Sequence, residues 1–372
     1  MRQLTFLLTF LALSACAPEV QEPPLDFILE GGTVYSGDNQ EGIVADVGII
    51  GDRIAAIGDL DERQATLRLD VSGLAVAPGF IDIHSHAVRS DPGDGIFRWP
   101  DAENLIRQGV TTVIGGPDGG SPLPITDTLT AIESSPASVN FGTFVGHGSI
   151  RGLVIGEEDR PPTDEELDLM RAQVRQAMES GAYGLSSGLI YLPGRFAETE
   201  EVIELAKVAA EYDGIYISHM REEGLDLLKS VAETIRIGEV GGLPTQLTHH
   251  KVVGAPMWGK STETLRMVDE AIDRGVDVSI DQYPYTASST SLTILFPGWS
   301  LDGGRPALLD RLADPEQRAR MKVDIVYRIE TDRGGNDPAN VALSNCPHDN
   351  SLNGLNLSQL LQQQEREVSK DN

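Results

Sequence analysis

The chain has 372 residues, which at a usual size of roughly 150 residues per domain is enough for two or three folded units. Lysine and arginine number 29 against 57 acidic residues, and the resulting net charge of −28 repels phosphate backbones, which argues against nucleic-acid binding. Apolar residues make up 40% of the chain, a composition that excludes a disordered protein.

The first residues resemble a bacterial lipoprotein signal. Arg2 precedes an apolar stretch at residues 4–13, and small residues then lead into Cys16. We expect cleavage before Cys16, lipidation of that residue, and export to a membrane-anchored position facing the periplasm or the cell exterior. Loss of residues 1–15 removes Arg2 and no acidic residue, so the charge becomes −29 from −28. An ordinary signal peptide with an incidental cysteine is the alternative.

A proline-rich tether and a small β unit are expected next. Residues 16–26 contain three prolines and two glutamates and are typical of an extended tether. Between residues 27 and 77, short apolar runs alternate with Gly, Asn and Asp, which predicts a small unit that we interpret as a β-sandwich. Its expected strands are 27–29, 31–35, 47–50, 53–57 and 66–69.

From residue 78 to about 340, apolar strands alternate with amphipathic helices, the order that predicts a parallel sheet. The expected strands are 80–86, 111–119, 141–148, 183–191, 215–221, 246–253 and 278–285. Seven successive βα units favour a (β/α)8 TIM-like barrel over an open sheet. No eighth strand is apparent, and residues 341–372 form a tail, so we expect a C-terminally truncated barrel.

Two of the expected helices carry clear start signals. Thr163 and Glu166 have the spacing of a capping box before a run of apolar residues at helical period. Ser261 is expected to cap a second helix, with Leu265, Val268 and Ile272 as its buried stripe. These signals place helices after the third and sixth barrel strands.

Histidines gather at the expected carboxyl ends of the strands, where parallel barrels bind their substrates. These histidines are His84, His86, His147, His219, His249 and His250, six of the seven in the chain. His84 and His86 are two residues apart on an expected strand, so both side chains point the same way, with Asp82 before them. A lone histidine is more often a core or surface residue, but the cluster predicts a metal site.

Six blocks of sequence occur in one order along the chain. They are PGFIDIHSH at 78–86, GVTTV at 109–113, SGLIYLPG at 187–194, SHMREE at 218–223, HHK at 249–251 and DQYPY at 281–285. Together they resemble the amidohydrolase superfamily, and within it the N-acyl-D-amino-acid deacylases, also called D-aminoacylases. The resemblance extends over about residues 27–289.

This resemblance implies a zinc-dependent hydrolase that cleaves the amide of an N-acyl-D-amino acid to a carboxylate and a D-amino acid. His84 and His86 match the first pair of metal ligands, His219 the ligand on strand five and His249 the ligand on strand six. The family commonly has a bridging cysteine in a Gly-Asn-Cys-Gly turn, and this chain has Asp118 in Gly-Pro-Asp-Gly. A carboxylate binds and bridges zinc as well, so one or two zinc ions are expected.

Three alternatives concern these ligands. His250 is expected to point away, although a swap with its neighbour His249 stays open. Asp118 is also a common turn residue in its own right. Some relatives in the wider superfamily use a carbamylated lysine on strand four, but residues 183–191 contain no lysine.

Lys251, Tyr283 and Ser289 match family positions that contact the substrate carboxylate. A solvated surface position for Lys251 and a packing role for Tyr283 and Tyr285 are the alternatives. The turn at 187–194 is expected to form part of the pocket wall. The implied partner is a small N-acyl amino acid, and no protein partner is evident.

The expected catalytic acid/base has no match. In the family it is an aspartate at the end of strand eight. Asp281 is the nearest substitute in kind but belongs to a block with its own family role, and Asp332 and Asp337 lie in irregular sequence. The catalytic residue therefore stays unassigned. The alternatives to the deacylase are another amidohydrolase, acting on cyclic amides or dipeptides, and a catalytically inactive truncated lipoprotein.

Overall fold

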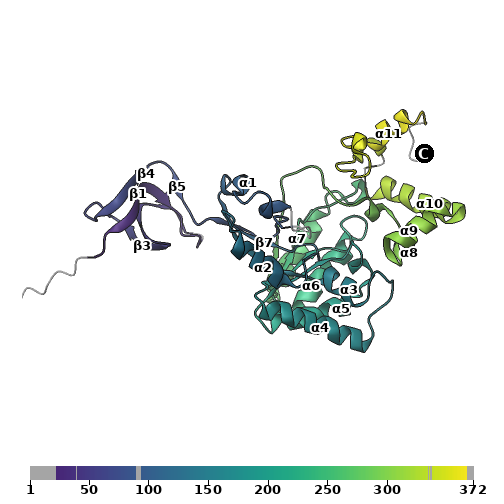
Figure 1. Ribbon diagram of the computed structural model, residues 1–372, viewed down its shortest axis with the longest axis horizontal. Helices are drawn as coiled ribbons and strands as arrows, with labels where there is room; N and C mark the ends of the chain where they lie inside the picture. Colours follow the sequence, from purple (N-terminus) through teal and green to yellow (C-terminus); the bar gives the residue numbers. More distant parts are fainter. Residues whose placement is uncertain (1–21, 39, 89–93, 334, 336, 367–372) are drawn as a thin grey trace, which may run out of the picture. The chain divides into compact units, whose positions relative to one another are not determined.

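The computed structural model describes residues 22–38, 40–88, 94–333, 335 and 337–366 (Figure 1). The expected signal at 1–15, the lipidation residue Cys16 and most of the tether lie outside these described residues. Two compact units divide between Gly79 and Phe80, close to the boundary expected at 77–78. In the part of the chain that is described, no helix is long and apolar enough to cross a membrane.

The N-terminal unit contains one mixed sheet. Its strands are β1 (Leu25–Val34), β2 (Ile43–Ile50), β3 (Arg53–Gly58), β4 (Ala65–Asp70) and β5 (Ala75–Val76). The order is β3-β2-β1-β4, with β5 also pairing with β1. Two expected strands are one strand here, β1, with a register irregularity between Leu29 and Gly32. Leu25, Ile28 and Leu60 cover one face, so the described residues supply one layer of the expected sandwich.

The second unit contains the parallel strands of the barrel. They are β6 (Phe80–Asp82), β7 (Val110–Gly115), β8 (Asn140–Thr143), β9 (Val145–Gly146), β10 (Gly184–Gly188), β11 (Ile215–His219), β12 (Thr245–Leu247) and β13 (Val278–Ile280). Two sheets, β6-β7-β8 and β13-β12-β11-β10-β9, share the third expected strand, because only Phe144 separates β8 from β9. The α/β barrel order expected from the sequence is confirmed. Within the described residues, β6 pairs with β7 alone and β13 with β12 alone.

Helices follow the strands in the barrel and continue beyond it. They are α1 (Glu103–Ile106), α2 (Ile125–Ser134), α3 (His147–Val154), α4 (Asp164–Glu179), α5 (Thr199–Ala210), α6 (Leu227–Gly241), α7 (Ser261–Asp273), α8 (Gly298–Leu301), α9 (Gly304–Ala313), α10 (Pro315–Thr331) and α11 (Leu357–Gln363). The capping box before α4 is confirmed, since Thr163 Oγ1 accepts from Glu166 N at 3.2 Å and Glu166 Oε2 accepts from Thr163 N at 2.8 Å.

The expected start of α7 is wrong, and of its three expected buried residues only Val268 is buried, while Leu265 and Ile272 are exposed. Lys260 is the N-cap, and Leu265 is 47% exposed. The buried side chains are Thr264, Val268 and Ala271. The reason is the hydroxyl of Thr264, which bonds the buried ring of His250 at 2.8 Å and turns this edge of the helix inward.

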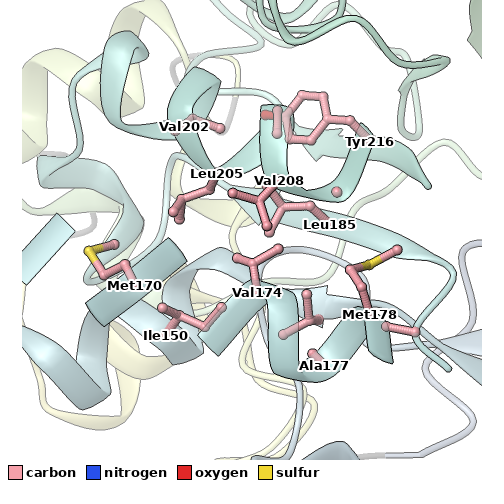
Figure 2. Close-up of a cluster of buried hydrophobic side chains, with 14 of the residues drawn as sticks. Ile150, Met170, Val174, Ala177, Met178, Leu185, Val202, Leu205, Val208 and Tyr216 are labelled. Carbon is pink, nitrogen blue, oxygen red and sulfur yellow. The ribbon is translucent and has the colours of Figure 1, made fainter. Parts of the chain in front are cut away.

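The largest apolar core lies between β10, β11 and the helices α3, α4 and α5. Figure 2 shows Val174 and Met178 of α4 below Leu185 of β10, with Leu205 of α5 beside them. Full burial of each large apolar side chain stabilises the fold by about 1.5–3 kcal/mol. This core holds the central strands whose carboxyl ends carry the functional residues.

A buried ionic network joins α3 to α5. Glu201 Oε1 contacts His147 Nε2 at 2.8 Å, and its other oxygen pairs with Arg151. None of the three side chains is more than 2% exposed. Burial alone raises the pKa of Glu201, but His147 and Arg151 outweigh it and hold the pKa below its usual value. His147 directly follows β9, at a strand end as expected, and its buried side chain belongs to this ionic network.

Replacement of Glu201 by glutamine is expected to destabilise the protein by about 3–5 kcal/mol, because it leaves the buried Arg151 charge without its counter-charge. Urea unfolding would measure the change. Glu200→Gln is the matched control, since the neighbouring Glu200 pairs with Arg236 on the surface and its loss is expected to change little. Equal unfolding midpoints for the two variants would contradict the prediction.

Candidate active site

Five side chains expected to bind metal come together at the carboxyl end of the barrel. His84 and His86 follow β6, Asp118 follows β7, His219 ends β11 and His249 follows β12. Parallel strands bring these ends to one edge, so residues far apart in the sequence meet there.

His84 and His86 lie on a loop rather than on the strand expected to carry them. Strand β6 ends at Asp82. The Asp82 Oδ1 atom accepts a hydrogen bond from His84 N at 3.0 Å, and this bond turns the backbone away from its pairing with β7. Ser85 N still donates to Ile114 O at 3.1 Å, which ties the loop to β7. Both imidazoles consequently reach the same carboxylate despite the end of the strand.

Asp118 lies in a tight turn that is held against β10. Its φ is +56°, and Ser186 Oγ both donates to Gly116 O at 2.6 Å and accepts from Gly119 N at 3.2 Å. A Cβ atom at Gly119 would lie 2.6 Å from the Gly188 nitrogen, so only glycine fits there. Asp118 is thus a turn residue, as the alternative proposed, and its carboxylate also faces the histidines.

Four imidazoles surround the Asp118 carboxylate. Oδ1 lies 3.3 Å from His84 Nε2, 3.6 Å from His219 Nδ1 and 3.6 Å from His249 Nε2, and Oδ2 lies 3.2 Å from His86 Nε2. Zinc bonds of about 2.0–2.2 Å in a tetrahedron put ligand atoms roughly 3.3–3.6 Å apart. Two trios share Asp118, one with His84 and His86 and one with His219 and His249. The set therefore has the spacing for one or two ions.

The polar atoms of this cluster also fit a divalent cation. Asp118 Oδ1, the oxygen that lies within 3.6 Å of three of the imidazoles, is buried without a hydrogen-bond partner. Although burial raises the pKa of Asp118, the surrounding imidazoles lower it well below its usual value. Burial lowers the pKa of His84, but Asp118 and Asp281 outweigh it and raise that pKa to about 10. The proton on His84 Nε2 faces the Asp118 carboxylate. A metal ion can take the place of that proton.

The three residues expected to bind the substrate carboxylate line the same cavity, of about 620 Å³. Lys251 Nζ lies 2.6 Å from Glu223 Oε1 and 5.4 Å from the centre of the Tyr283 ring. The Lys251 side chain is only 19% exposed, so the solvated alternative does not describe it. Tyr283 packs against Tyr285, and Ser289, which is exposed, also lines the cavity.

Parts of the cavity wall match the sequence analysis and parts do not. Ile190 and Tyr191, from the turn expected to form the wall, line the cavity. His250 points away into its bond with Thr264, so His249 is the histidine that faces the cluster. Glu223 and Arg333 also line the cavity. The sequence predicted no functional role for either residue.

The three aspartates considered as acid/base lie in different surroundings. Asp281 lines the cavity, with Oδ2 3.3 Å from His84 Nδ1. Asp332 is buried beside Arg333 and outside the cavity lining, where burial and the Glu222 carboxylate raise its pKa to about 6. Asp337 does not belong to the lining either. The surroundings of these three aspartates do not identify any of them as the catalytic acid.

Comparison with protein families agrees with the fold. A model described as the amidohydrolase family matches residues 69–324. The chain belongs to this family, as the resemblance of the six blocks implied.

Individual relatives show which members of this family the chain resembles. A D-aminoacylase of Alcaligenes xylosoxydans xylosoxydans is 42% identical over 292 residues, covering 72% of this chain and 59% of that protein. An N-acyl-D-glutamate deacylase of the same organism is 38% identical over 291 residues, covering 72% and 58%. The chain thus spans less than two thirds of the length of these relatives.

Two solved structures are similar over most of the chain. A crystal structure of D-aminoacylase has a TM-score of 0.74 and 33% identity, covering 94% of this chain and 69% of that one. An N-acyl-D-glutamate deacylase from Bordetella bronchiseptica, complexed with zinc and a phosphonate inhibitor, has a TM-score of 0.76 and 30% identity, with the same coverage. The recognition of a D-aminoacylase-like amidohydrolase is confirmed.

The role of Asp118 as a shared ligand stays a prediction and can be tested by metal binding. Loss of an outer partner of a ligand typically costs 10–100-fold in metal affinity, so Asp118→Asn is expected to weaken zinc binding by at least about 100-fold. Competition with a chromophoric chelator would measure it. Asp118→Cys should retain binding, since thiolate is also a zinc ligand.

Asp127→Asn on the exposed face of α2 is the control for this experiment. Zinc affinity of Asp118→Asn equal to that of Asp127→Asn would remove Asp118 from the ligand set.

Proposed function

We propose that this chain is a zinc-dependent hydrolase that cleaves N-acyl-D-amino acids to a carboxylate and a D-amino acid. The observation that carries the proposal is the carboxylate of Asp118 among four imidazoles, in one cavity with the ammonium group of Lys251. The names of the similar proteins, D-aminoacylase and N-acyl-D-glutamate deacylase, support the same reaction class.

Zinc would be held by His84, His86, Asp118, His219 and His249. When bound, a divalent cation supplies Lewis acidity that polarises an amide carbonyl and acidifies water. The zinc complex of the Bordetella relative supports the choice of metal. Its phosphonate inhibitor, described as a mimic of the tetrahedral intermediate, supports hydrolysis as the reaction.

Lys251, Tyr283 and Ser289 would hold the α-carboxylate of the substrate. Lys251 Nζ donates to Glu223 Oε1 at 2.6 Å and to His249 O at 3.2 Å, and it lies 2.7 Å from His249 Nδ1. A substrate carboxylate would replace one of these contacts. The two hydroxyl groups, from different positions along the loop after β13, would fix the direction of that carboxylate. A fixed carboxylate and a fixed carbonyl together let only one enantiomer present its amide to the metal.

Hydrolysis of N-acetyl-D-methionine by the zinc-loaded chain is expected, with little turnover of the L-enantiomer and loss of activity in chelator. Free amine release measures both. Lys251→Met should raise KM by about 10–100-fold, because a hydrogen bond to a charged group contributes roughly 1.5–3 kcal/mol. Lys260→Met, which removes a lysine paired with Glu263 on α7, is the control.

Other substrates decide between the alternatives. Turnover of a hydantoin or a dipeptide, with none of the N-acyl-D-amino acid, would contradict the proposal in favour of another amidohydrolase. Zinc binding without turnover of any of these substrates would favour the inactive protein.

We also propose that the chain is exported and anchored through a lipid on Cys16. The support is the sequence of residues 1–16, with its arginine, apolar stretch and cysteine. In a bacterial host fed radiolabelled palmitate, the full chain is expected to take up label and to fractionate with membranes. Cys16→Ser should lose both properties, and unchanged labelling of that variant would contradict the anchor.

A further inference from the structure

Arg333 is a buried residue to which the proposed reaction gives no role. It is 8% exposed and lines the same cavity as Lys251 and the metal-binding cluster. A guanidinium group is not deprotonated in proteins, so its positive charge is permanent. Arg333 therefore adds a second cationic side chain to the cavity, besides Lys251.

The end of α10 fixes the position of Arg333. The backbone N–H groups of Asp332 and Arg333 both donate to Arg328 O, at 2.8 and 2.7 Å, and so close the last turn of the helix. The loop after β12 packs closely on this turn. A Cβ atom at Gly254, where φ is +85°, would lie 2.7 Å from Thr331 O, so only glycine fits there. This contact holds a residue from beyond the barrel strands against the cavity.

The protein does not use the hydrogen-bonding capacity of the Arg333 guanidinium. Nε lies 3.6 Å from Asp332 Oδ2, and Nη2 lies 3.8 Å from Glu223 Oε2, distances too long for hydrogen bonds. Both nitrogens are buried without a hydrogen-bond partner among the described residues. Buried donors without partners are uncommon because each one costs free energy. The two carboxylates thus balance the charge of Arg333 and leave its N–H groups for another acceptor.

Arg333 and Lys251 lie against the same carboxylate. Lys251 Nζ contacts Glu223 Oε1 at 2.6 Å, and Arg333 Nη2 faces Glu223 Oε2. Lys251 is proposed to bind the α-carboxylate of the substrate. In an N-acyl amino acid the α-carboxylate and the side chain leave the same carbon atom, whereas the acyl group is bonded to the nitrogen. A second cation beside Lys251 therefore suits a second carboxylate on the side chain.

We infer that Arg333 is a specificity-determining residue whose guanidinium binds a carboxylate on the side chain of the substrate, so that the chain prefers N-acyl-D-amino acids with an acidic side chain. This inference rests on the proposed function and names the class of its substrate. The planar guanidinium matches a carboxylate in a short contact of two parallel hydrogen bonds. An uncharged amide side chain of the same size forms a weaker contact with it.

Two other roles for Arg333 lead to a different expectation. If Arg333 only balanced the charges of Glu223 and Asp332, its loss would weaken the binding of acidic and neutral ligands alike. The same would hold if Arg333 shared the α-carboxylate with Lys251. The ratio of affinities between an acidic ligand and its neutral isostere separates both roles from the inference.

The first experiment measures the binding of D-glutamate and D-glutamine to the zinc-loaded full chain by isothermal titration calorimetry. These two ligands are products of the proposed reaction and are not consumed, and they differ only in the charge of the side-chain group. We expect D-glutamate to bind about 10–100-fold more tightly, the usual effect of a hydrogen bond to a charged group. Arg333→Met should abolish this preference. Arg333→Lys should retain part of it, because lysine keeps the charge and lacks the planar fork.

Arg318→Met is the matched control, because it removes an exposed arginine from the same helix, α10, and should keep the full preference. An equal loss of affinity for both ligands in Arg333→Met would overturn the inference. An undiminished preference in a folded Arg333→Met, as judged by circular dichroism, would overturn it as well.

The second experiment uses only the unaltered chain and so does not depend on the folding of a variant. It compares kcat/KM for N-acetyl-D-glutamate, N-acetyl-D-glutamine and N-succinyl-D-glutamine. The acidic side chain should raise kcat/KM by about 10–100-fold, and the acidic acyl group should not. Equal values for the two acetyl substrates, or a preference that follows the succinyl group, would overturn the inference and leave the proposed function intact. Absence of turnover of every N-acyl-D-amino acid would overturn the proposed function, and the binding experiment would still decide the role of Arg333.

Discussion

The attraction between one partly buried carboxylate and four imidazoles is the contact around which the rest of the site is arranged. Asp118 lies where histidines from β11, β12 and the loop after β6 converge, and its oxygens lie 3.2–3.6 Å from their nitrogens. Such a concentration of lone pairs and charge is costly in a protein interior unless a cation or protons balance it. The turn that holds Asp118 and the loop that carries His84 bring the carboxylate and the imidazoles together.

The surrounding fold holds the side chains of the site in fixed positions. The apolar core beneath β10 and β11 fixes the strands from one side, and the paired Glu201 and Arg151 tie α5 to α3. Ser186 of β10 connects these strands to the site. Its hydroxyl donates to Gly116 O and accepts from Gly119 N, so it holds both ends of the turn that contains Asp118.

Much of the fold could be predicted because it depends on local periodicity. The parallel strands and the start of α4 agree with patterns of apolar residues and caps. The errors had two causes. A contact between separate elements, the bond from Thr264 to His250, sets the buried face of α7. A local contact ends β6 early, because the Asp82 side chain accepts a hydrogen bond from the His84 backbone N–H.

The residue types of the site, namely the paired histidines, the His-His-Lys run and the aspartate in place of a cysteine, are properties of the sequence alone. The sequence also determined that these residues lie at strand ends, because strand order and strand polarity follow from alternation along the chain. Only the tertiary structure decided which atoms meet. The positions of Glu223 and Arg333 in the cavity, the separate surroundings of His147 and the choice of His249 over His250 depend on burial and ring orientation. Those are set by packing between segments distant in sequence, for which no local pattern exists.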